Sequence, residues 1–145
     1  MLVAAESYLL QAEAYMKGYL SGNAMMAFEN GVTASFRYLY KEINGNLRAG
    51  KDPVADFATY KANNADNYLV NYSLAASPAQ KLEAIITQKY IAYNFINAQE
   101  TWAEFKRTAY PKIVNGSSNP NLTFASFLSS STRADELPVR YLYAS

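Results

Sequence analysis

Apolar residues recur every three or four positions through most of this 145-residue chain, and short turn signals interrupt the pattern. This spacing places side chains on one face of an α-helix, because the helix turns once every 3.6 residues. Two such segments, about Val3 to Leu20 and about Ala24 to Ile43, open the chain. Hydrophobic residues make up 50% of the sequence and charged residues 17%, a composition typical of a packed globular domain. An all-α fold is therefore predicted.

A very short turn, "SGN" at Ser21 to Asn23, joins the first two segments. It supplies a glycine to end one helix and an asparagine to cap the next. Helices joined so closely pack as antiparallel neighbours. Glu13 stands four residues before Lys17, which predicts an exposed ion pair. The apolar faces expected to meet contain Ala5, Tyr8, Ala12, Tyr15, Met16 and Tyr19 on the first helix, and Phe28, Val32, Phe36 and Tyr40 on the second.

The same two segments follow the pattern of the 34-residue tetratricopeptide repeat. Small residues in that pattern let two helices approach, and large ones fill the space beside them. The proline position of the repeat holds Phe36, and an ordinary αα-hairpin would show similar spacing. The prediction is a tetratricopeptide-like helical hairpin, with the pattern's positions taken in order by Tyr8, Ala12, Tyr15, Ala24 and Phe28.

Three more helices are predicted after the first two segments. Asp52 and Pro53 begin a short one that runs to about Tyr60. Ser77 as N-cap and Pro78 begin a longer one, which carries apolar residues on two faces and is expected to be buried nearly all round. A last helix covers about Ala98 to Thr108, while Tyr68 to Tyr72 fits either a helical turn or a short extended piece. The two faces of the longer helix hold Leu82, Ile85, Ile86, Tyr90 and Tyr93, and Ile91 and Phe95.

After residue 110 the helical period is lost, although apolar side chains continue. So long a stretch without regular structure is unusual inside a compact domain. We expect one domain with a tetratricopeptide-like helical region at 1–110 and a long irregular C-terminal segment at 111–145 that packs on the helices. Its apolar residues include Phe124, Phe127, Leu128, Tyr141 and Tyr143.

The absence of cysteine and histidine limits the chemistry available to the chain. Without them there is no disulfide, no thiolate nucleophile, no imidazole base and no common transition-metal ligand. Glu100 and Glu104 share a helix face, but that face is expected to be an ordinary solvated one, so no catalytic residue, metal site or cofactor is predicted. A formal net charge of +1 without blocks of like charge gives no field for nucleic acid. The chain is predicted not to be an enzyme.

Thirteen tyrosines and a single tryptophan raise the question of sugar stacking, since an aromatic ring packs well against a pyranose. Most of these side chains lie at core spacing and are expected to pack internally. Trp102 is expected to be largely buried between the last two helices. The sequence identifies no ligand contact directly, and the candidates for ligand binding are Tyr110, Tyr141 and Tyr143.

Three separated blocks resemble the SusD/RagB family of outer-membrane nutrient-binding lipoproteins. The longest, "KLEAIITQKYIAYNFINAQETWAEFKRTAYPKI", is similar to the family's C-terminal helical region. "AEAYMKGYLSGNAMMAFENGVTASF" resembles its tetratricopeptide-like pair, and "LPVRYLYAS" its late "PxRxxYP" segment. Lys106, Ala109 and Ala144 depart from the family's usual arginine, glycine and proline. The agreement in the longest block is specific at Gln88, Lys89, Tyr90, Trp102, Arg107, Thr108, Tyr110 and Pro111.

The resemblance implies a cell-surface protein that captures oligosaccharides or other nutrients and delivers them to a SusC-like TonB-dependent channel in the outer membrane. Family members are longer and lipid-anchored, so the chain is interpreted as a soluble C-terminal fragment of such a protein. The resemblance also implies that the helices form a scaffold, with Arg107 pairing with a carboxylate or with carbonyls of the "LPVR" segment. The alternative hypothesis is a stand-alone tetratricopeptide-like module that binds another protein.

Overall fold

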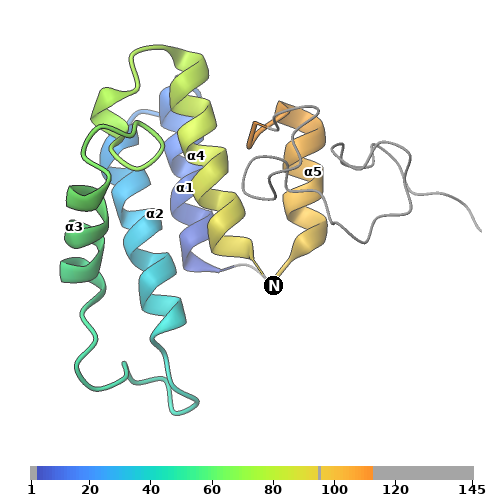
Figure 1. Ribbon diagram of the computed structural model, residues 1–145. Helices are drawn as coiled ribbons and strands as arrows, with labels where there is room; N and C mark the ends of the chain where they lie inside the picture. The colour runs from blue at the N-terminus through green and yellow to red at the C-terminus, as the bar shows by residue number, and fades with distance from the viewer. Residues whose placement is uncertain (1–2, 95, 113–145) are drawn as a thin grey trace, which may run out of the picture.

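The computed structural model describes residues 3–94 and 96–112, and these form an all-α fold (Figure 1). No β-strand occurs in these two ranges, and a single β-bridge joins Lys41 to Leu47. The all-α prediction is confirmed. The elements are α1 (Ala4–Met16), α2 (Ala24–Leu39), α3 (Pro53–Asn63), a short 3-10 turn η1 (Tyr72–Leu74), α4 (Pro78–Tyr93) and α5 (Ala98–Thr108).

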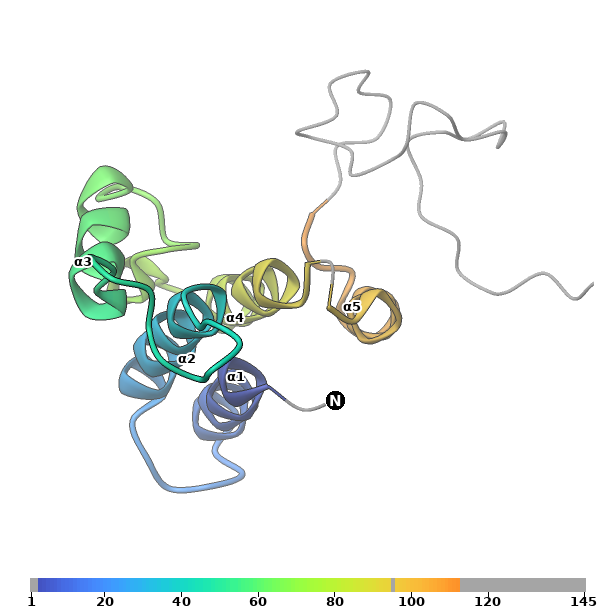
Figure 2. The same ribbon diagram turned by 90° about the horizontal axis from the view of Figure 1, so that it is seen from below.

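The helices are arranged around a central group of three. α1 and α2 form the predicted antiparallel hairpin, and α4 lies along α1 and touches α2. Seen from below, α3 covers the outer side of α2, while α5 lies beyond α4 at the opposite end of the row (Figure 2). The assignment of the α1–α2 hairpin to the tetratricopeptide repeat remains a prediction.

The predicted capping residues begin three of the helices. The Asn23 side chain accepts a hydrogen bond from the Met26 amide at 3.0 Å, at the start of α2. Asp52 caps α3, with Pro53 in its first turn. Ser77 forms a capping box with Gln80 at the start of α4. Each cap satisfies backbone amides that have no partner within the helix, so local sequence was sufficient to place these helix starts.

α1 ends earlier than the apolar pattern indicated. The helix stops at Met16 rather than near Leu20, because Gly18 adopts a left-handed conformation with φ of 73°. The Tyr19 amide then donates to the Ala14 carbonyl at 2.9 Å, which is the backward bond of a Schellman cap. The stop signal is therefore Gly18, and the segment from there to Gly22 is the turn.

The buried face of α1 matches the prediction at Ala5 and Ala12 but not at Tyr8 and Tyr19. The core includes Ala5, Leu9 and Ala12, whereas Tyr8 is 38% exposed and Tyr19 is 75% exposed. Leu9 fits against Gly31 of α2, where an added Cβ would lie 2.7 Å from the Leu9 Cγ. A leucine thus fills the closest approach of the two helices without a hydroxyl to satisfy, and the bulkier tyrosines remain at the surface.

The main core lies where α1, α2, α3, η1 and α4 meet. Phe28 of α2 is fully buried, and its ring lies 4.9 Å from that of Tyr72 in η1. The first predicted face of α4 is buried at Ile85, Ile86 and Tyr93, but Ile91 of the second predicted face is 47% exposed, so this helix is not buried nearly all round. Phe95 lies outside the described residues. The core residues are Leu9, Ala12, Ala27, Phe28, Val32, Phe57, Tyr72, Ala84 and Ile85.

The C-terminal cap of α5 generates a stability prediction. Ala109 has φ of 59° and ψ of 23°, a left-handed conformation that costs an L-residue with a Cβ about 1–2 kcal/mol and glycine almost nothing. Ala109→Gly is therefore expected to raise the free energy of unfolding by about 1 kcal/mol, as measured by urea denaturation followed by circular dichroism.

The matched control is Ala103→Gly, an exposed position in the interior of the same helix. There glycine should lower the free energy of unfolding by about 1 kcal/mol. If both substitutions destabilise to the same extent, the left-handed cap at Ala109 is wrong.

Candidate functional site

Lys89 of α4 is the most deeply buried charged residue at the junction with α5. Its side chain is only 2% exposed, and its ammonium lies 2.5 Å from Glu104 Oε1 and 3.7 Å from Glu100 Oε1. Both carboxylates come from α5, one turn apart on the side that meets α4. The expectation of a solvated acidic face was therefore wrong for Glu104, which is buried, and Glu100 stands at the edge.

Arg107 extends this pairing to the first helix. Its guanidinium donates hydrogen bonds to both carboxylate oxygens of Glu13, at 2.7 and 2.8 Å. Glu13 lies 94 positions earlier in the chain. It also donates to Glu104 Oε2, from Nη2 at 2.6 Å and from Nε at 3.0 Å. A planar guanidinium can engage two carboxylates at once because its N–H groups point in fixed, divergent directions. One side chain of α5 thereby joins α1 to the α4–α5 junction.

Glu13 also pairs with Lys17 at 2.6 Å, so the predicted ion pair is present, but the Glu13 carboxylate is buried rather than exposed. The complete set forms an alternating chain of positive and negative groups. We call it the interhelical ion network, and its members in order are Lys17, Glu13, Arg107, Glu104, Lys89 and Glu100.

The network stabilises the charged forms of Glu13 and Arg107. Burial disfavours the ionised Glu13 carboxylate, but hydrogen bonds from Arg107 and Lys17 outweigh burial and hold the pKa of Glu13 below its ordinary value of 4.5. The hydrogen bond to Glu13 raises the pKa of Arg107 against the effect of burial, and Glu104 adds to the rise. The stabilisation due to Glu13 is therefore present above pH 4.5 and is lost as the pH falls through its lower folded-state pKa.

Other residues that carry the family resemblance also make internal contacts. The Gln88 amide donates to the Leu69 carbonyl at 2.9 Å and holds the loop that precedes α4. The Thr108 hydroxyl donates to the Glu104 carbonyl at 2.7 Å and accepts from the Tyr110 amide at 3.2 Å. Pro111, which follows a cis peptide bond, is buried. These contacts fix the end of α5 and the turn after it.

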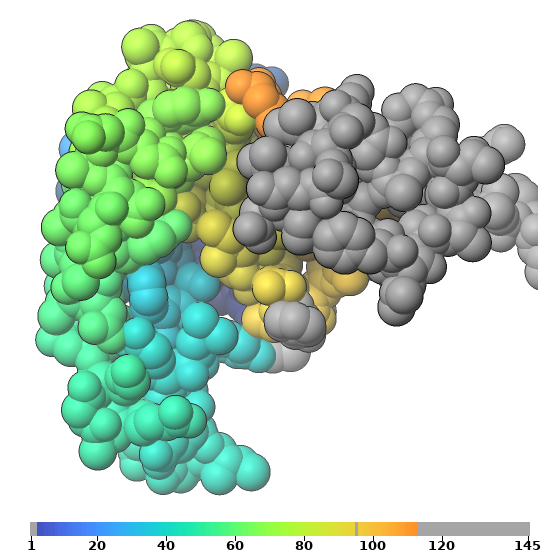
Figure 3. Space-filling view, in the orientation of Figure 1, coloured from blue at the N-terminus to red at the C-terminus, as the bar shows by residue number. Residues whose placement is uncertain are grey.

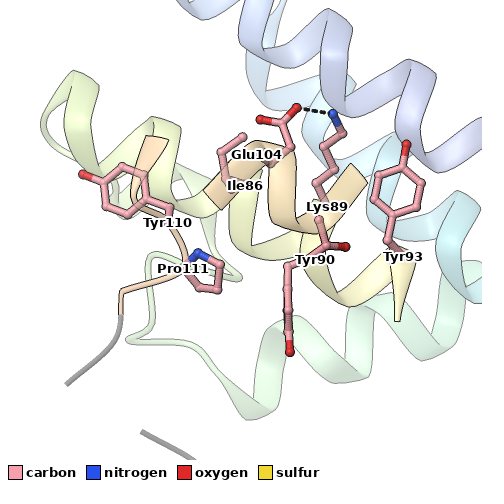
Figure 4. A pocket seen from close by; sticks show the side chains of 8 residues that line it. Ile86, Lys89, Tyr90, Tyr93, Glu104, Tyr110 and Pro111 are labelled. Atoms are coloured by element: carbon pink, nitrogen blue, oxygen red, sulfur yellow. Dashed lines mark hydrogen bonds and ion pairs between the residues drawn. The ribbon is translucent and has the colours of Figure 1, made fainter. Parts of the chain in front are cut away.

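Figure 4 shows how these side chains lie around the α4–α5 junction, with Lys89 directed at Glu104 and Tyr93 beside it. The space enclosed by the surrounding residues is too small to hold a water molecule. The Tyr93 hydroxyl is buried and has no hydrogen-bond partner among the described residues. Burial raises the pKa of Tyr93, and the nearby Glu6 carboxylate raises it further. The junction is thus closed and tightly packed.

The structure describes two of the aromatic residues singled out in the sequence, Trp102 and Tyr110. Trp102 on α5 is intermediate in burial, and the Lys106 ammonium lies 4.7 Å from its ring centroid. Tyr110 is also partly exposed, with the Lys112 ammonium 5.9 Å from its ring. Tyr141, Tyr143 and the "LPVR" segment lie outside the described residues. The grouping of the three candidate ligand tyrosines therefore stays a prediction.

The arrangement defines a helical scaffold whose charged residues are engaged with one another. Each carboxylate of the interhelical ion network faces at least one cation. Sequence reasoning found Arg107 but missed its partner Glu13, because no local signal connects residues 94 positions apart. In the two described ranges, no helix is long and apolar enough to cross a membrane, and no three acidic side chains gather as a metal site would require.

Comparison with known proteins identifies the family. The model of the SusD-like family, described as SusD and RagB outer membrane lipoproteins, matches residues 1–134. The chain belongs to the SusD-like family, and the resemblance noted in the sequence is confirmed. Membership indicates a nutrient- or glycan-binding lipoprotein of the outer membrane, a class of binding proteins rather than enzymes. No curated protein and no solved structure matches the chain.

The burial of Lys89 generates a prediction for its two carboxylate partners. Glu104→Gln leaves a buried ammonium without its nearest counter-charge, which is expected to lower the free energy of unfolding by about 3–5 kcal/mol. Glu100→Gln makes the same chemical change at a more exposed position 3.7 Å from Lys89 and should cost less than about 1 kcal/mol. Urea denaturation of both variants, followed by circular dichroism, measures the difference. Equal costs would show that Lys89 does not depend on Glu104.

Proposed function

We propose that this chain is the helical part of a cell-surface lipoprotein that binds glycans or other nutrients and delivers them to a SusC-like TonB-dependent channel of the outer membrane. The observation that carries the proposal is the family match over residues 1–134. Capture of a ligand at the cell surface needs a binding protein held at the membrane and a transporter beside it, so the channel is the expected partner. No nucleic acid and no cofactor is required.

In this proposal the described helices act as the scaffold of the binding protein. Support comes from the way Gln88, Lys89, Arg107 and Thr108 are used, since all four make contacts within the chain. The charged groups of the α4–α5 junction are thereby paired, and the space between the surrounding side chains is too small to hold a water molecule. Recognition of a sugar requires an open aromatic face together with polar groups that fix its hydroxyls.

Tyr110, Tyr141 and Tyr143 remain the proposed ligand contacts within this chain. Tyr110 follows directly on α5 and keeps part of its ring exposed, as a stacking surface requires. A single aromatic face supplies little binding energy beyond the ordering cost of association. The chain by itself is therefore expected to bind glycans weakly or undetectably and to show no glycosidase activity.

The proposal is tested with the complete reading frame that contains this chain, expressed in a Gram-negative host. Labelling with a radioactive fatty acid, followed by affinity purification from detergent-solubilised outer membranes, should yield a lipidated protein together with a TonB-dependent channel. Calorimetry with starch, mucin and plant-polysaccharide fragments should detect binding to the full-length protein. A protein without lipid that retrieves a different protein and no channel would support the stand-alone interaction module instead.

A separate titration tests the proposed role of Tyr110, Tyr141 and Tyr143 as ligand contacts. The isolated 145-residue chain is titrated with the same fragments at millimolar concentration. Micromolar affinity that is lost in Tyr110→Ala, Tyr141→Ala or Tyr143→Ala would locate the whole binding site in this chain, against the scaffold proposal.

A further inference from the structure

An apolar groove lies between α2, α3 and α4, on the side of α4 that faces away from α5. It encloses about 180 Å³. Figure 3 shows the hollow, with α3 (green) on one side, α4 (yellow) on the other and the end of α2 (cyan) below. The residues that form most of its wall are Val32, Phe36, Leu39, Tyr60, Gln88 and Ile91.

The chemistry of the groove suits an uncharged, apolar occupant. None of the described residues that line it is charged. The polar group of Gln88 is already engaged, because its amide donates to the Leu69 carbonyl and, at 3.4 Å, to the Tyr60 hydroxyl. Two apolar side chains at the groove are left in contact with water, since Leu39 is 65% exposed and Ile91 is 47% exposed. Covering such surface is favourable by about 25 cal/mol per Å².

The last described residue, Lys112, is anchored on α4, the helix that forms one wall of this groove. The Lys112 ammonium lies 2.7 Å from Glu83 Oε2 on α4, and the Tyr68 hydroxyl donates to the same oxygen at 2.8 Å. Glu83, Thr87 and Ile91 stand four residues apart, so they share one strip of α4 that runs from this anchor to the groove. At 1.5 Å per residue the strip is about 12 Å long. An extended chain of about four residues spans that distance.

The sequence that follows Lys112 has the composition that the groove requires. Residues 113–132 contain no charged residue, and Phe124, Phe127 and Leu128 give this stretch an apolar cluster. The cluster begins 12 residues after Lys112 (124 − 112 = 12), well within reach of the groove. The next charged residue is Arg133.

We propose that the segment from Phe124 to Leu128 of the same chain occupies the groove between α2, α3 and α4, with the Lys112–Glu83 ion pair as the point from which the segment crosses α4. The occupant is part of the protein, so the groove is an internal docking site and not a ligand pocket. This inference does not depend on the proposed nutrient-binding function.

Cross-linking tests the proposal, because the chain contains no cysteine and two introduced thiols are the only ones present. Ser35 lines the groove and Ser126 lies inside the proposed segment. In the full 145-residue chain, Ser35→Cys with Ser126→Cys should form an intramolecular cross-link with a short bismaleimide. The matched control pairs Ser126→Cys with Ala58→Cys, an exposed position on α3 that does not line the groove.

The expected result is cross-linking at least fivefold faster for the Ser35 pair than for the Ala58 pair, with the joined peptides identified by mass spectrometry after trypsin digestion. Equal rates, or no cross-link in either pair, would overturn the proposal. A cross-link that joins two chains, seen as a dimer on a denaturing gel, would assign the groove to the segment of a second copy and would also overturn it.

A second experiment tests the groove without cysteines. Ile91→Glu places a charge at the groove, while Val54→Glu places one at an exposed apolar position on α3 outside it. Release of the segment should speed trypsin cleavage after Arg133 several-fold in the first variant and leave it unchanged in the second. Circular dichroism checks that both variants keep their helices, and Leu39→Glu replaces Ile91→Glu if that variant loses them. Unchanged cleavage in a folded groove variant would contradict the proposal.

Discussion

The contact of Arg107 with Glu13 and Glu104 joins α5 to the rest of the described helices. Among the residues of α5 only Glu104 is fully buried, while Trp102 and Phe105 are partly buried. Charged groups form the polar part of this joint: Lys89 of α4 and Arg107 of α5 both meet Glu104, and Arg107 also reaches Glu13 on α1. Buried charges are tolerated only when they are paired, so Glu13, Lys89 and Glu104, the buried members of the interhelical ion network, require their partners.

Several residues that carry the family resemblance make contacts within this fold. The residues through which the chain resembles SusD-like proteins include Gln88, Lys89, Arg107 and Thr108, and in the structure each binds another part of the same chain. The family pattern at this junction therefore reflects the contacts that join α5 to the other described helices. Such a joint supports the proposed scaffold role.

Local signals predicted the helices well, because caps and periodicity act over a few residues. Asn23, Asp52 and Ser77 begin their helices as expected. The buried face of α1 was predicted correctly at Ala5 and Ala12 but not at Tyr8, since Leu9 fits against α2 instead, and that choice depends on a partner helix. The acidic face of α5 was assigned to solvent for a similar reason. Its counter-charges are Lys89 of α4 and Arg107 of α5, and the pairing with Lys89, 15 positions away, leaves no trace in the local sequence.

The energetic coupling between Glu13 and Arg107 tests this account most directly. A double-mutant cycle with Glu13→Gln, Arg107→Met and the combined variant isolates their interaction from the other contacts of each residue. The account predicts a coupling free energy of about 1.5 kcal/mol or more from urea denaturation at pH 7, within the range of about 0.5–3 kcal/mol for residues in one ion network. Effects that add to within about 0.3 kcal/mol would contradict it, because additivity is the behaviour of independent sites.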